Sequence, residues 1–173
     1  MSKLTLRTQF LVFSVASALL AAVVGLVGWR GAQELERAQT ALVETLEASS
    51  NHMDADMMHD ALRADVLAAI LAGRDGTGAD EVKQALQEHS ERFEADLAKN
   101  AQFHLAPEVV AAVEEARPAL DAYVKAARSM LDLALTDPAA ATANQPQFMQ
   151  AFTALEGKME ELSDLIDASA STA

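Results

Sequence analysis

Four side chains suited to ligand binding recur at helical spacing in the first half of the chain: His52, Asp56, His59 and Arg63. Their spacings of four, three and four place them within an arc of about 60° on one helix. A guanidinium group matches a carboxylate with two parallel hydrogen bonds, and imidazole rings can bind a second polar group. The pattern predicts a site for a small anion, with Arg63 as its anchor.

A second arginine could complete this clamp. Arg117 and Arg128 both belong to the third long helical segment, and either could reach a carboxylate that Arg63 binds. We include Arg128 among the predicted ligand-binding residues.

The same stripe allows a metal site. His52, Asp56 and His59 supply imidazole and carboxylate on successive turns, which suits a divalent transition metal. No fourth ligand is evident. Asp56-x-x-His59 also has the spacing found in di-iron bundles, but those need a second copy and two further glutamates, which we do not find.

Asp60 offers an interpretation without any ligand. It falls among the apolar residues that we predict to face the core, where a carboxylate is costly unless it is paired. His89 and Arg117 lie on the predicted core faces of other helices. We expect these three residues to form a buried polar cluster that fixes helix register.

Catalytic motifs are missing from the sequence. It contains no nucleophile elbow, glycine-rich phosphate loop, HExxH motif or convincing pair of converging carboxylates. The absence of cysteine excludes disulfides, thiolate metal sites and cysteine nucleophiles. The sequence therefore favours binding over chemistry, and we predict no enzymatic activity and no cofactor.

The elements that must position these residues are helices. Apolar spacing predicts helices over about 30–72, 80–101, 107–135 and 146–170, with Pro118 inside the third and "TDPAAATANQP" as a break before the fourth. Such helices can bury their stripes only against one another, so we predict an all-α, antiparallel up-down-up-down four-helix bundle over 30–173. The predicted core face of the first helix comprises Leu35, Leu42, Leu46, Met53, Met57, Ala64, Leu67 and Leu71.

Residues 10–29 form a candidate transmembrane helix that continues into the first bundle helix. They contain no charge, and 20 residues at about 1.5 Å each span a bilayer core of roughly 30 Å. Lys3 and Arg7 precede the segment, so the positive-inside rule predicts residues 1–9 in the cytoplasm. A cleaved signal peptide is the alternative, although the apolar run is too long for one.

Charge is concentrated in the remainder of the chain. The formal net charge is −13, and all 26 acidic residues lie beyond Gly31. Such a surface should repel nucleic acid and anionic lipid. We therefore expect no nucleic-acid partner.

This layout resembles the periplasmic sensor domain of bacterial methyl-accepting chemotaxis proteins, and "DMMHDALRADVLAAILAG" (56–73) looks like the first bundle helix of many members. The resemblance implies a homodimer in the bacterial inner membrane that binds amino acids or organic acids near the membrane-distal end. Arginines of the first bundle helix and residues of the fourth hold such ligands. Here Arg63 matches the former, and Phe152 and Thr153 lie at the right height for the latter.

Other outputs remain open at this stage. The same bundle serves as the sensor of histidine kinases, and a membrane-anchored scaffold could use the polar stripe for self-association alone. No second membrane helix, linker domain or signalling hairpin follows in this sequence, so we expect a chain cut before a second membrane pass.

Overall fold

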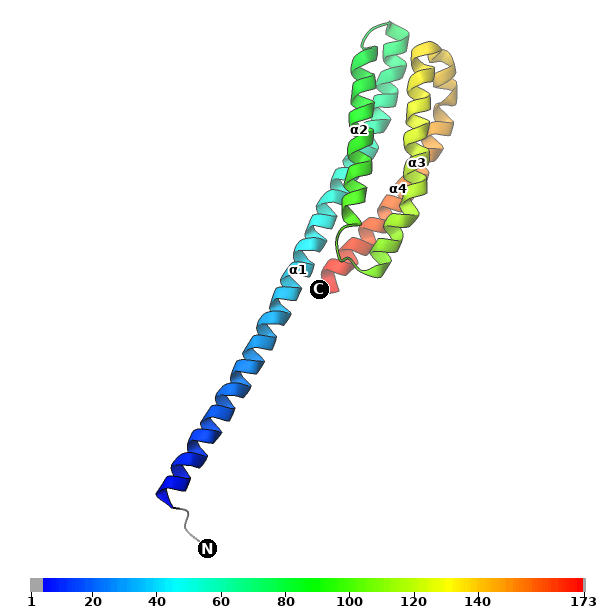
Figure 1. Ribbon diagram of the computed structural model, residues 1–173. Coiled ribbons are helices and arrows are strands. Elements are labelled where there is room, and N and C mark those ends of the chain that lie inside the picture. Colours follow the sequence, from blue (N-terminus) through cyan, green and yellow to red (C-terminus); the bar gives the residue numbers. More distant parts are fainter. Residues whose placement is uncertain (1–4, 173) are drawn as a thin grey trace. The chain divides into compact units, whose positions relative to one another are not determined.

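Four α-helices make up the computed structural model, which describes residues 5–172 (Figure 1). They are α1 (Leu6–Asp75), α2 (Ala79–Asn100), α3 (Pro107–Thr136) and α4 (Pro138–Thr172), and the described residues contain no strand. The prediction of an all-α four-helix bundle is confirmed. The chain divides into two compact units, Met1–Thr40 and Ala41–Ala173.

The expected break before the fourth helix is much shorter than predicted. Only Asp137 separates α3 from α4, and Pro146 lies inside α4 rather than at its start. The Asp137 side chain accepts a hydrogen bond from the backbone N–H of Ala140 at 3.0 Å, which caps the new helix. Pro138 then occupies the first helical turn, where its missing N–H breaks no helical hydrogen bond.

The first unit contains the candidate membrane span. α1 includes a stretch near the N-terminus that is long and apolar enough to cross a bilayer, and none of that stretch is buried by protein. Large apolar side chains such as Phe10, Leu20 and Trp29 are exposed. The assignment of residues 1–9 to the cytoplasm stays a prediction, and Lys3 lies outside the described residues.

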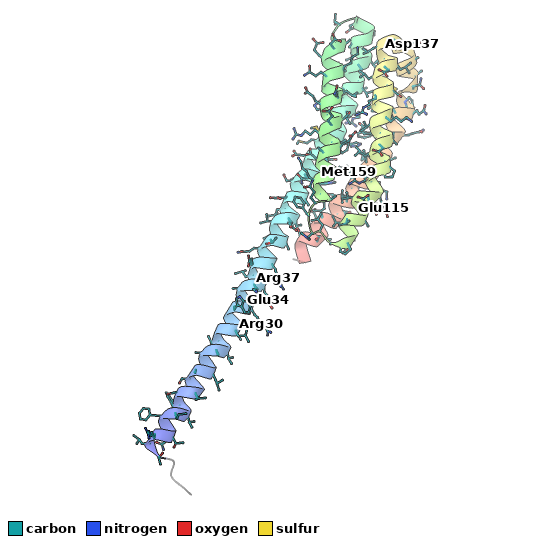
Figure 2. All side chains as sticks on the ribbon, in the orientation of Figure 1. Arg30, Glu34, Arg37, Glu115, Asp137 and Met159 are labelled. Atoms are coloured by element: carbon teal, nitrogen blue, oxygen red, sulfur yellow. The ribbon has the colours of Figure 1, made fainter. Side chains whose placement is uncertain are left out.

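The core of the second unit is built largely on α3 and α4. The apolar residues that recur at helical spacing on these two helices are buried: Val109, Val113, Leu120, Val124, Ala127 and Leu131 on α3, and Phe148, Phe152, Leu155, Met159, Leu162 and Ile166 on α4. On α2, Leu86, Phe93 and Leu97 join them. Figure 2 labels Glu115 on α3, which is exposed, and Met159 on α4, which is buried.

The predicted core face of α1 was wrong. The residues that pack inward are Ala48, His52, Ala55, His59, Leu62, Val66 and Ala69, which we call the inward face. The larger residues Leu42, Leu46, Met53, Met57, Leu67 and Leu71 are all exposed, and we call them the outward stripe. Both sets follow helical spacing, and at 100° per residue they lie about 150° apart. Because α1 has two apolar faces at helical spacing, the spacing alone does not determine which of them is buried.

A close helix contact explains why small residues face inward at the end of α1. A Cβ atom added to Gly73 would lie 1.9 Å from the backbone oxygen of Ala134 on α3 and 3.1 Å from Cγ of Pro138. Glycine therefore allows α1 to approach the α3–α4 turn, where Figure 2 labels Asp137. Gly76 and Gly78 then adopt positive φ angles in the turn that leads to α2.

Candidate functional site

The clearest cluster of aromatic and basic groups joins α1 to α4 at His59, Arg63 and Phe152. The rings of His59 and Phe152 stack at a centroid distance of 4.1 Å with an interplanar angle of 8°. The guanidinium carbon of Arg63 lies 4.5 Å from the centroid of the same Phe152 ring. Two residues one turn apart on α1 therefore contact one side chain of α4. The structure brings Arg63 and Phe152 together, and their predicted role in ligand binding stays a prediction.

The neighbouring helices complete the surroundings of His59. Tyr123 of α3 packs edge-on against the imidazole at 5.0 Å, and Phe93 of α2 lies 6.2 Å away. The Tyr123 hydroxyl donates a hydrogen bond of 2.8 Å to the backbone oxygen of His59. Burial raises the pKa of this phenol, so it remains a hydrogen-bond donor. Sequence reasoning missed Tyr123, although a single tyrosine on an apolar helix face was a usable signal.

His59 is a buried structural histidine in this arrangement. It was predicted to bind a ligand together with Arg63, but its side chain faces the core and the residue is only 2% exposed. Nε2 lies 3.2 Å from the backbone oxygen of Phe152, and since a carbonyl only accepts, Nε2 carries the proton. Burial lowers the pKa of His59, and this effect outweighs the hydrogen bond to Phe152 and the nearby acids Asp56, Asp60 and Glu156.

His52 is buried as well, and the predicted stripe is therefore split. Burial lowers the pKa of His52 despite the charges of Asp56 and Asp167, and its Nδ1 atom has no hydrogen-bond partner. Asp56 is exposed. Within residues 5–172 no three His, Asp or Glu side chains gather closely enough to hold a metal ion, so the structure does not support the alternative metal site.

The predicted polar cluster of Asp60, His89 and Arg117 does not exist. Asp60 is exposed because it belongs to the outward side of α1, and it pairs with Arg63 at 3.0 Å. His89 instead contacts Asp65, whose Oδ2 lies 2.7 Å from Nδ1. Arg117 pairs with Glu114 on its own helix at 3.0 Å. Because the buried side of α1 differs from the predicted one, the acidic residue that faces inward is Asp65 and not Asp60.

Of the two remaining predicted site residues, Arg128 lies apart from the aromatic cluster and Thr153 lies at its edge. Arg128 pairs with Glu94 of α2 at 3.6 Å and lines grooves between α2 and α3. The structure therefore does not bring it to Arg63. Thr153 is exposed and follows Phe152 directly on α4.

A polar network between α1 and α2 was also missed. Asn51 donates a hydrogen bond of 3.0 Å to Asn100, which in turn donates one of 3.3 Å to the backbone oxygen of Ala48. Arg92 of α2 bridges to Asp54 of α1 at 3.3 Å and to the buried Asp96 at 3.5 Å. These contacts hold α1 against α2 in the half of the bundle away from the glycine turn.

Comparison with known proteins assigns a family to this architecture. Residues 3–173 match the family described as the four helix bundle sensory module for signal transduction. No curated protein and no solved structure gave a match. The family match spans nearly the whole chain, both the apolar segment and the bundle, and the described residues form four helices. The chain is a member of this family of signal-transducing sensory modules.

Proposed function

We propose that this chain is the ligand-binding sensor of a transmembrane chemotaxis receptor, with its bundle in the periplasm, and that it binds a small anion at Arg63. The main support for the anion site is the position of Arg63. Its side chain is 39% exposed, so it can reach both solvent and the ring of Phe152. The aromatic ring orients the guanidinium plane and leaves its hydrogen-bonding edges available.

Asp60 gives this site an internal competitor. It occupies one edge of the guanidinium at 3.0 Å, as a ligand carboxylate would. An exposed ion pair of this kind is worth only about 0 to 1 kcal/mol, so a ligand with two or more contacts can displace it. Asp60→Asn should therefore strengthen anion binding.

A second copy of the chain would cover the outward stripe. Six large apolar side chains along one side of α1 exceed the scattered exposed residues expected of a monomer surface. A symmetric pairing of α1 with α1 of another copy would bury them. Asp60 lies within this stripe and Arg63 lies at its margin, so an anion bound to Arg63 would lie beside the dimer interface.

The same geometry provides a route for the signal. Phe152 belongs to α4, whereas Arg63 and His59 belong to α1, which also contains the apolar segment. An anion that binds Arg63 more tightly in one arrangement of α1 and α4 than in another shifts the population toward that arrangement. A small displacement of one helix past the other would then carry the signal across the membrane.

Thermal unfolding of the full chain in lipid nanodiscs tests the ligand site. Probes are succinate, malate, citrate and aspartate, each of which should raise the unfolding temperature if it binds only the folded state. Arg63→Ala should abolish the shift. Arg117→Ala is the matched control, because Arg117 pairs with Glu114 three residues earlier just as Arg63 pairs with Asp60. A shift that survives Arg63→Ala contradicts the assignment, and no shift with any carboxylate favours a scaffold without sensing.

The absence of cysteine makes the dimer directly testable. Met57→Cys in the outward stripe should form a disulfide-linked dimer under mild oxidation, whereas Gln87→Cys on the exposed side of α2 should not. Equal cross-linking at the two positions would indicate random collision instead of a defined interface.

A further inference from the structure

A groove of about 380 Å³ lies between α3 and α4, and its lining does not include Arg63, His59 or Phe152. It exists because Ala122 and Ala126, one turn apart on α3, project only a methyl group toward it. Its floor is apolar and includes Met130, Leu133 and Phe148. Its volume falls within the range of small-molecule pockets.

Lys125 lines this groove and differs from every other basic residue of the bundle. Among residues 41–172, each of the other eight lysine and arginine side chains has an ion pair within 4.0 Å: Arg63, Arg74, Lys83, Arg92, Lys99, Arg117, Arg128 and Lys158. Lys125 has none, although the chain contains 26 acidic and 13 basic residues. Even Asp121, one turn earlier on α3, is not within that distance, although Asp121 and Lys125 both line the adjoining groove between α2 and α3.

We propose that this groove is a second ligand site, for a monocarboxylate with a compact apolar body such as an aromatic acid. Lys125 binds the carboxylate, and the body lies on the apolar floor formed by α3 and Phe148. Ser129 and Gln147 at the groove supply polar contacts for the carboxylate or for a ring substituent.

The chemistry of the groove selects this class over the anions that suit Arg63. A dicarboxylate would place its second charge against Met130 and Phe148, where desolvation is unfavourable. An organic cation would meet the charge of Lys125. The two sites share α4 but use different residues: Arg63 contacts Phe152, whereas the groove is lined by Gln147 and Phe148.

Photolabelling of the full chain in nanodiscs tests the groove. The probe is 4-benzoylbenzoate, an aromatic monocarboxylate that attaches to nearby C–H bonds on illumination. Peptide mapping should place the label on residues 122–133 or 144–148. Benzoate should compete for labelling, whereas benzamide, which has the same shape without the charge, should not.

Three variants make the result decisive. Lys125→Gln should reduce labelling at least fivefold, and because this side chain is exposed the bundle should stay folded. Ala126→Leu should do the same by filling the groove. Lys158→Gln is the matched control and should label like the parent chain, since Lys158 is engaged by Glu115 and Glu161. Arg63→Ala should also leave the labelling unchanged.

The opposite results overturn the proposal. If Lys125→Gln labels as strongly as the parent, or benzamide competes as well as benzoate, the groove does not recognise a carboxylate. If the label maps outside α3 and α4, or no competable label forms, the groove is not a ligand site.

Discussion

The two sides of α1 within the bundle have opposite compositions and opposite surroundings. The inward face is built largely from alanines and two histidines, and it is buried by three other helices. The outward stripe carries leucines and methionines, and no other part of the described chain covers it. Apolar size alone therefore does not identify the core side of a helix that has two apolar faces. The small side chains belong where helices approach closely, and the large ones belong where a partner can still be added.

The largest expected effect comes from replacing one leucine on the inward face and one on the outward stripe. Leu62→Ala, at a fully buried position, should lower the free energy of unfolding by about 2 to 5 kcal/mol, since it leaves a cavity among four helices. Leu67→Ala on the outward stripe should cost less than about 1 kcal/mol in the isolated monomer. Urea unfolding of both variants in detergent measures this difference in the free energy of unfolding. The protein concentration is kept low enough to prevent association. Equal losses would mean that the two sides are not distinct.

A second test probes the close approach at the end of the inward face. Gly73→Ala should destabilise the bundle by about 1 to 3 kcal/mol, because the new methyl group would overlap the backbone oxygen of Ala134. Gly157→Ala in α4 is the control: no atom lies within 4 Å of its added Cβ. Alanine there should stabilise the helix by about 0.5 to 1 kcal/mol. A stable Gly73→Ala chain would show that α1 and α3 can separate freely at this end.

The sequence predicted the packing of a helix well where that helix has a single apolar stripe. Helices α2, α3 and α4 each have one apolar stripe, so their core residues followed from spacing alone. The start of α4 did not follow, because proline and small polar residues read as a break, whereas Pro138 fits a first turn and Pro146 is accommodated within the helix.

The site was predicted less well, for a related reason. Arg63 and Phe152 were each named as ligand-binding residues from a family resemblance; the structure places them in contact, and their role in binding stays a prediction. Whether His52 and His59 face a ligand or the core depends on the rotation of α1 about its own axis. The spacing of the residues does not determine this rotation, because α1 has two apolar faces. Asp60 and Asp65 exchanged roles for the same reason, and Asp65, next to Val66, could have been recognised as the inward acid only once Val66 was known to be buried.

That exchange of acids gives a third test. Asp65→Asn should lower the free energy of unfolding by about 1 to 3 kcal/mol, because the Asp65 side chain is 11% exposed and its contact with His89 joins α1 to α2. Asp60→Asn removes an exposed ion pair and should change stability by less than about 0.5 kcal/mol. The same denaturant titration measures both. A larger effect at Asp60 would restore the original assignment of the inward acid.

The smallest expected effect is the pH dependence that the two histidines of the inward face give to the free energy of unfolding. Burial lowers the pKa of His59 from its ordinary 6.5, so below about pH 6.5 the unfolded chain binds a proton that the folded chain resists. The free energy of unfolding should therefore fall as the pH drops from 6.5 to the folded pKa, by at most about 1.4 kcal/mol per pH unit for each such histidine. His52 contributes in the same direction.

The variant His59→Phe isolates this contribution. Phenylalanine keeps a ring against Phe152 but cannot titrate, so the stability of the variant should vary less between pH 8 and pH 5.5 than that of the parent chain. An unchanged slope in His59→Phe would mean that the inward face opens enough for water to reach the imidazole. The inward face, despite its burial, would then be a side of α1 that admits water.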